Sequence, residues 1–392
     1  MNLQPVSTNE RIKAIDLMRG FALLGILLIN MLAFHSPLSY IDPYKWFNGS
    51  VNEGIYLVID IFIQASFYPL FAMLFGYGLA MQYMRAEAIG QPFTPLALKR
   101  LTVLLLFGVV HAFLIWYGDI LITYAIMGFL LIGLIRLPSS WLMSFGAVIY
   151  AVPHLLMLVI LFIAATADPN TYVGYMEIEN SIQSYQSGSF AEIFSQRLAD
   201  WSYRNNGIGF VFLVFTILPF LMFGAAAAKW RLIERTQEKR KLWLFLAIVP
   251  LLIGLALKSS PYIFDSNYAF VYLQDLFGGP LVSIGYATLI ALMAQKQSLQ
   301  KLFSPIAKVG SMSLTTYITQ SVLATLIFYS YGLGLYGKVD LLTGTLIAFG
   351  IFVVQLIFAE LWFEKFSRGP LEILWRKWTY GNNFEKTNNS KR

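Results

Sequence analysis

Long apolar runs recur along the whole chain instead of alternating with polar positions. Each is close to, or longer than, the roughly 20 residues that a helix needs to cross a bilayer core at ~1.5 Å per residue. A helix on the surface of a soluble domain has one apolar stripe and one polar face, which these runs lack. We therefore predict about ten transmembrane helices, at 15–34, 54–84, 99–117, 119–136, 141–166, 207–229, 242–258, 269–294, 312–335 and 341–363.

The composition agrees with this prediction. Hydrophobic residues make up 57% of the chain and charged residues 12%, whereas soluble domains contain about 25% charged residues. The first run, 15–34, is long for the core of a cleavable signal and lacks a small-residue cleavage site, so we expect a retained first span. The predicted fold class is an all-α integral membrane protein.

The basic residues gather on one side of the predicted spans. Of the 28 Lys and Arg residues, the opposite side receives only Lys45, Arg197, Arg204, Lys258 and Lys338. The positive-inside rule then predicts that both termini are cytoplasmic, in a multi-pass protein of the bacterial inner membrane. The net charge of +7 is explained by this topology and by anionic lipid on the cytoplasmic side, so we expect no nucleic-acid partner.

A polar segment divides the spans into two sets of five. Because five is odd, the second set begins on the other side of the membrane, so any repeat would be inverted, as in many transporters. Trp375 and Trp378 lie among basic residues near the end, which is typical of an interfacial helix. The expected parts are a cytoplasmic tail at 1–14, a five-helix half at 15–166, an extracytoplasmic loop at 167–206, a second half at 207–363, and a cytoplasmic interfacial helix with a tail at 364–392.

Polar side chains within the spans are the candidates for a functional site. Such residues are costly in a membrane and usually face the interior of the bundle or a wet cavity. Counting from the flanking charges puts Asn30 and His111 level with each other, each ~16 Å from the inner boundary. Asp60 and Asp275 lie ~10 Å from the outer boundary, near Gln64. The chain has no Cys, and we expect no metal site.

Asp119 follows His111 by eight residues, which is about 12 Å along a continuous helix. Unless the helix breaks at Gly118, we therefore expect Asp60 to be the partner of His111. Asp119 is then expected to contact an acceptor or to cap the next helix.

Two further features concern the second half. Gly278-Gly279-Pro280 follows Asp275 and predicts a break in the helix. Gln320 is a candidate for substrate binding, with hydrogen bonding between helices as the alternative.

Five phrases together resemble the YeiB-like family of bacterial polytopic membrane proteins (domain of unknown function 418). They are IDLMRGFALLGILLINM (15–31), FYPLFAMLFGYGLAM (67–81), KRLTVLLLFGVVHAFLIWYGDILITYAIMG (99–128), GSMSLTTYITQSVL (310–323) and RGPLEILWRKWTYG (368–381). The opening phrase is also distantly similar to membrane acyltransferases of the heparan-glucosamine acetyltransferase type, which have an Arg-Gly pair and an Asn, here Arg19-Gly20 and Asn30. The catalytic His of that type corresponds to Ile41 in this sequence, which leaves His111 as the candidate base.

The resemblance and the polar residues favour a membrane-embedded acyltransferase acting on an extracytoplasmic glycan or lipid. His111 would be the base, with Asp60 or Asp119 orienting it and Asn30 stabilising the oxyanion. Arg19 and Arg100 would bind the phosphates of acyl-coenzyme A, with an acyl-lipid as the other possible donor.

The alternative hypothesis is a proton-coupled secondary transporter of a small molecule, in which Asp60, Asp275 and His111 relay protons. A structural or sensing role is the third. The sequence leaves the oligomeric state open.

Overall fold

The computed structural model describes residues 12–167 and 175–381, and its regular elements in these ranges are helices. Seven helical stretches are long and apolar enough to span a membrane: Lys13–His35, Phe93–Ile115, Ser139–Thr166, Gly207–Lys229, Arg240–Lys258, Tyr268–Met293 and Leu341–Lys365. The chain is therefore a multi-pass membrane protein. The tail segments 1–11 and 382–392 lie outside the described residues.

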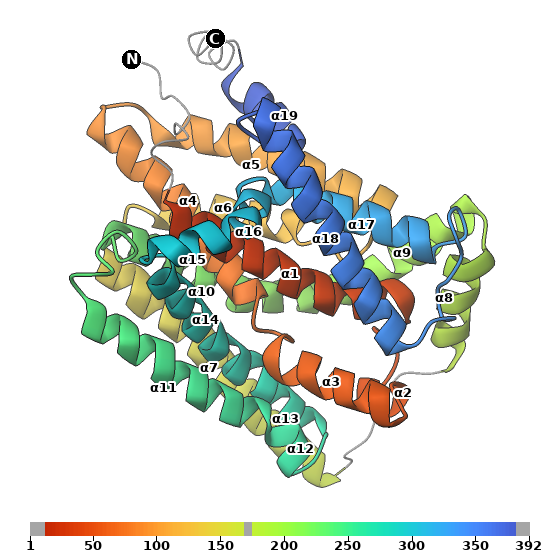
Figure 1. The fold of residues 1–392 in the computed structure, drawn as a ribbon. Coiled ribbons are helices and arrows are strands. Elements are labelled where there is room, and N and C mark those ends of the chain that lie inside the picture. The colour runs from red at the N-terminus through yellow and green to blue at the C-terminus, as the bar shows by residue number, and fades with distance from the viewer. Residues whose placement is uncertain (1–11, 168–174, 382–392) are drawn as a thin grey trace.

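Figure 1 shows the helices in chain order. They are α1 (Lys13–His35), α2 (Pro43–Trp46), α3 (Ser50–Phe62), α4 (Tyr68–Ala88), α5 (Phe93–Val110), α6 (Leu121–Leu134), α7 (Ser139–Ala167), α8 (Tyr175–Ser187), α9 (Phe190–Arg204), α10 (Gly207–Lys229), α11 (Arg240–Lys258), α12 (Ser260–Ile263), α13 (Tyr268–Leu273), α14 (Gly279–Met293), α15 (Gln297–Leu302), α16 (Ser304–Ser311), α17 (Ser313–Phe328), α18 (Leu341–Lys365) and α19 (Pro370–Tyr380). Two π-helical turns, His111–Ile115 and Gln274–Gly278, continue α5 and α13. In Figure 1, α8 and α9 lie on the side of the bundle opposite to α11.

The predicted span at 54–84 is wrong as a single helix. The structure divides this stretch into α3 and α4, with a turn between them in which Ala65 has a φ of 56°. Pro69 in the first turn of α4 explains the division, because proline favours the start of a helix and disrupts its interior. Two other predicted spans, 119–136 and 312–335, contain the shorter apolar helices α6 and α17. The seven longer stretches and these shorter helices do not establish the predicted count of ten.

The predicted break at Gly278-Gly279-Pro280 is also wrong. The helix runs from Tyr268 to Met293 and accommodates the proline through the π-helical turn before it. The Gly279 amide bonds to the Gln274 carbonyl, and Pro280 lies in the first turn of α14, where its missing N–H costs little.

Close backbone contacts hold the centre of the bundle together. A Cβ at Gly76 on α4 would lie 2.0 Å from the Leu221 carbonyl oxygen on α10, and a Cβ at Gly224 would lie 1.8 Å from that of Met73. Only glycine permits this approach, which is the usual way in which membrane helices pack tightly without a hydrophobic driving force.

The C-terminal helix α19 is docked on the bundle. The Trp375 Nε1 atom donates to the Arg100 carbonyl at 3.0 Å. The Glu372 carboxylate accepts hydrogen bonds from the Leu314 amide and the Thr315 hydroxyl, both at 2.7 Å. The helix predicted to lie in the interface therefore also joins α5 to α17.

Candidate active site

Three buried side chains form a hydrogen-bonded relay. His111 Nδ1 lies 2.8 Å from Asp119 Oδ1, and His111 Nε2 lies 2.8 Å from Ser321 Oγ on α17. His111 is 0% exposed and Ser321 is 1% exposed. In the tautomer with the proton on Nδ1, the ring donates to Asp119 and accepts from the Ser321 hydroxyl. This order of hydroxyl, imidazole and carboxylate is that of a nucleophile, its base and the group that orients the base.

The local fold brings Asp119 back to His111. The helix widens into a π-turn at His111, and the Trp116 amide bonds to the His111 carbonyl at 2.8 Å. Trp116 is then extended, so the chain turns at Gly118 instead of continuing as a helix. A Cβ at Gly118 would lie 2.2 Å from the Trp116 ring, so this turn requires glycine. Asp119 Oδ2 accepts the Ile122 amide at 2.7 Å and thus also caps α6.

The expectation that Asp60 is the partner of His111 is therefore wrong. Asp60 Oδ1 accepts a hydrogen bond from Gln274 at 2.6 Å, and its Oδ2 accepts from Tyr44 and Tyr262 at 2.9 and 3.0 Å. The prediction failed because it measured the distance from His111 to Asp119 along a straight helix. The break it named as the exception occurs just before Gly118.

A cavity of about 500 Å³, the far cavity, lies beside the C-terminal half of α1. Its lining includes Asn30, Gln64, Gly118-Asp119, Asp275 and Arg204. Four of these are sequence candidates, which the fold gathers from α1, the α3–α4 turn, the α6 entry and the π-turn after α13. The Gln64 amide donates to Asp275 Oδ2 at 3.2 Å, whereas Asp275 Oδ1 is buried without a partner among the described residues.

A second cavity of about 220 Å³, the near cavity, lies beside the N-terminal half of α1 and under α19. Four arginines line it: Arg19, Arg85, Arg100 and Arg376. The Arg100 guanidinium lies 4.4 Å from the centre of the Trp375 ring, and Arg19 is 3.4 Å from Asp16. A concave site with several guanidinium groups is suited to phosphate, which arginine binds through paired hydrogen bonds.

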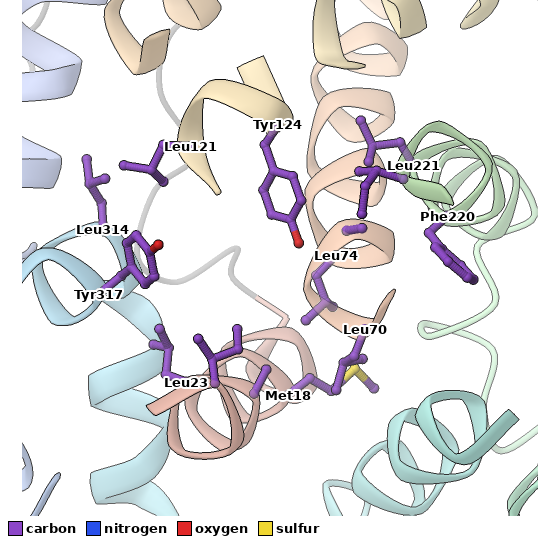
Figure 2. Packing of buried hydrophobic residues seen from close by; sticks show 14 of the residues in the cluster. Met18, Leu23, Leu70, Leu74, Leu121, Tyr124, Phe220, Leu221, Leu314 and Tyr317 are labelled. Carbon is purple, nitrogen blue, oxygen red and sulfur yellow. The ribbon is translucent and has the colours of Figure 1, made fainter. Parts of the chain in front are cut away.

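One layer of side chains separates the two cavities. Phe71 lines the near cavity and Tyr68 the far one, only three residues or ~4.5 Å apart along α4. Tyr124 stacks on Phe71, and its hydroxyl donates to the Tyr68 carbonyl at 3.0 Å. Figure 2 shows Tyr124 near Leu74, with Tyr317 and Leu23 facing them from α17 and α1.

Tyr317 links this layer to the relay. It lines the far cavity, and its ring centre lies 5.0 Å from that of His111. Its hydroxyl donates to the Gly118 carbonyl at 3.1 Å. His111 and Ser321 do not line either cavity, so Tyr317 stands between His111 and the far cavity.

Not every candidate lines a cavity. Gln320 is buried and joins α17 to its neighbours, donating to Gln355 Oε1 at 3.0 Å and to the Leu23 carbonyl at 3.4 Å. These contacts favour the alternative to substrate binding, which is hydrogen bonding between helices. Ser321 was missed, because one serine in the polar phrase SLTTYITQS carries no signal of its own until His111 is seen beside it.

Comparisons with known proteins give the family context. Residues 227–382 match the family described as Protein of unknown function (DUF418). The chain is 34% identical to the uncharacterized protein YxaH of Bacillus subtilis (strain 168), over 97% of this chain and 96% of that protein. It is 29% identical to the uncharacterized protein YeiB of Escherichia coli (strain K12), over 94% and 96%. These names say nothing of acyl transfer, so the similarity to acyltransferases stays a prediction.

Proposed function

Since the chain belongs to the YeiB-like family (DUF418), and since it carries a Ser321–His111–Asp119 relay beside the layer between two cavities, we propose that it is a membrane acyltransferase. The acyl group moves from a donor in the near cavity to an acceptor in the far cavity. The single observation that carries the proposal is that His111 binds a hydroxyl with one ring nitrogen and a carboxylate with the other.

The near cavity is the proposed donor site. Its arginines suit the phosphates of acyl-coenzyme A, and the cavity of about 220 Å³ accommodates that part of the molecule. We infer that this side faces the cytoplasm, where acyl-coenzyme A is available, in agreement with the basic residues around it. Because Ser321 lines neither cavity, the thioester end has to pass the side chains around Ser321 to reach it, and the acceptor has to pass Tyr317.

The proposed reaction has two halves. Ser321 Oγ attacks the thioester carbonyl while its proton passes to His111 Nε2; the C–S bond breaks, and the departing thiolate takes that proton. An acceptor hydroxyl then attacks the acyl ester and gives its proton to His111; the ester bond to Ser321 breaks, and His111 returns the proton to Ser321. Asp119 accepts a hydrogen bond from the Nδ1–H group throughout and does not itself take the proton. Asn30 is the candidate donor to the oxyanion.

The test uses purified protein in lipid nanodiscs with radiolabelled acetyl-coenzyme A. We expect release of free coenzyme A and a hydroxylamine-sensitive label on Ser321, located by peptide mass spectrometry. Ser321→Ala should abolish the label, and Ser321→Cys should restore acylation as a thioester. The matched control is Ser283→Ala, since Ser283 is 0% exposed within the membrane helix α14 and its hydroxyl has no partner among the described residues. No acylation of Ser321 in the wild type, or undiminished coenzyme A release by Ser321→Ala, would overturn the proposal.

Proton-coupled transport is a second candidate, favoured by a buried charge cluster. Lys258 is 0% exposed, and its Nζ donates to the Gln64 carbonyl at 2.8 Å, close to Asp60 and Asp275. Two acids beside one lysine within membrane helices are a candidate proton-binding site. Substrate uptake into vesicles that follows an imposed proton gradient and is lost in Asp275→Asn would support transport and count against the enzyme.

A further inference from the structure

The far cavity is continuous with a second hollow that opens to the outside of the bundle between α7, α10 and α13. This hollow, of about 580 Å³, shares seven lining residues with the far cavity, among them Arg204, Thr216, Tyr272 and Asp275. We call it the lateral opening. A molecule in the far cavity can therefore extend into it without crossing a layer of protein.

Most other residues of the lateral opening are apolar and belong to helices that are long and apolar enough to span a membrane. Met157 and Leu161 come from α7, a stretch of which only 6% is buried. Ile208 on α10 is 83% exposed, and Val271 lies across the opening on α13. Because these residues are apolar and belong to predicted membrane spans, the opening suits a hydrocarbon chain better than a water-soluble substrate.

A single guanidinium group marks the polar end of the opening. Arg204 is the last residue of α9, lines both hollows and is exposed. It makes no ion pair among the described residues; its ring contact is with Tyr117, 5.9 Å from the guanidinium carbon. An arginine at the boundary between an apolar opening and a polar cavity is placed to bind a lipid phosphate.

We propose that the acyl acceptor is an anionic phospholipid whose head group carries hydroxyls. Its phosphate lies on Arg204, one chain lies between α10 and α13, and the head group enters the far cavity toward Asp119. Asp275 Oδ1, buried and without a partner among the described residues, accepts a hydrogen bond from a head-group hydroxyl. This inference rests on the proposed function: the acyl ester of Ser321 is broken by the head-group oxygen, a new ester forms on the lipid, and the hydroxyl proton returns to Ser321 through His111.

The experiment maps where lipid binds, without measuring turnover. The probe is phosphatidylglycerol with a photoreactive diazirine in one acyl chain, in nanodiscs that contain the full chain. We expect crosslinks concentrated on 208–213 of α10 and 268–272 of α13. Val271→Trp or, if that variant folds poorly, Ile208→Trp should reduce them at least fivefold. Leu156→Trp is the matched control, because Leu156 is 61% exposed on α7 and does not line the opening.

A second arm tests the phosphate. The same diazirine chain on diacylglycerol, which lacks a phosphate, should crosslink weakly to the wild type. Arg204→Gln should lower the phosphatidylglycerol signal toward that level. Crosslinks spread evenly over the lipid-facing helices and unchanged by Val271→Trp would overturn the inference.

The two proposals can fail separately. Acylation of Ser321 in the wild type tests the relay and needs no acceptor. If Ser321 is acylated and glycerol phosphate accepts the group as fast as phosphatidylglycerol does, the proposed acyltransferase activity is supported and the proposed lipid acceptor is contradicted. If the crosslinks map to the opening and no acyl-Ser321 forms, the lipid site stands, but the chain does not use it for acyl transfer in the proposed way.

Discussion

His111 and Asp119 are joined by a hydrogen bond of 2.8 Å although they are eight positions apart in the apolar sequence that joins α5 to α6. The π-turn at His111 and the extended Trp116 end the helix early, and Gly118 allows the chain to fold back beneath the Trp116 ring. Asp119 then serves two partners at once, the imidazole through Oδ1 and the first turn of α6 through Oδ2. The start of α6 therefore fixes the orientation of the histidine.

Replacing Asp119 should separate its two roles. Asp119→Asn keeps a good helix cap but favours the wrong tautomer of His111, so we expect the rate of Ser321 acylation to fall by up to ~10⁴-fold with little loss of stability. Asp119→Ala should lose the cap as well, which lowers the free energy of unfolding by about 1 kcal/mol. Acylation rates and thermal denaturation measure the two effects.

Asp340→Asn is the control for this pair. Asp340 caps α18 by accepting the Thr343 amide at 2.9 Å, and it lines neither cavity. Its substitution should leave acylation unchanged. If Asp119→Asn also acylates within tenfold of the wild type, the carboxylate only caps α6.

Gly118→Ala should disturb the relay without touching its side chains. The added Cβ would meet the Trp116 ring at 2.2 Å, so the turn or the ring has to move, at a cost of about 1–3 kcal/mol for such overpacking. We expect acylation to fall more than tenfold as Asp119 moves away from His111. Gly133→Ala on α6 has no atom within 4 Å of its Cβ and should match the wild type. Equal acylation in both variants would show that the turn does not set the geometry.

Arginines of the near cavity should control the affinity for the donor. Arg19→Gln and Arg100→Gln each remove a guanidinium group from its wall, and a lost hydrogen bond to a charged group costs about 1.5–3 kcal/mol. We expect KM for acetyl-coenzyme A to rise about ten- to a hundredfold, with a smaller change in kcat, because this binding is shared by ground and transition states. Arg235→Gln should change neither constant, since the Arg235 side chain is 52% exposed and lies outside the cavity. A change in kcat without a change in KM would show that these arginines do not bind the donor in the ground state.

Asp200 should give the stability of α9 a dependence on pH. Its carboxylate accepts hydrogen bonds from Tyr40 and Tyr185, both at 2.6 Å, and burial raises the pKa of this carboxyl above its usual value. The folded protein therefore binds the proton more tightly than the unfolded chain does. The resulting stabilisation is complete below the pKa of the unfolded chain and is lost as the pH rises through the folded pKa.

The matched variant for this effect is Asp200→Asn, which cannot titrate. On going from pH 7 to pH 5, the melting temperature of the wild type should rise relative to that of the variant. A difference that is constant with pH, or that moves in favour of the variant on acidification, would contradict the assignment.

The sequence by itself determined that this is a helical membrane protein. An apolar run of about 20 residues is long enough to cross a bilayer, and as a helix it satisfies its backbone hydrogen bonds within the segment. It also identified several of the polar residues that line the two cavities, such as Asn30, Gln64 and Asp275. Polar groups are costly to bury in a membrane, so the few that occur within apolar runs stand out from the residues around them.

Only the tertiary structure decided which of these residues meet. Counting along a helix assumes 1.5 Å per residue, and that assumption fails at the π-turn of His111. Asp119 therefore returns to the imidazole, whereas Asp60 bonds to Gln274 instead. Ser321 is 210 residues from His111, and no local pattern joins two such positions. Their contact depends on how α17 packs against the π-turn after α5, which periodicity and hydropathy do not encode.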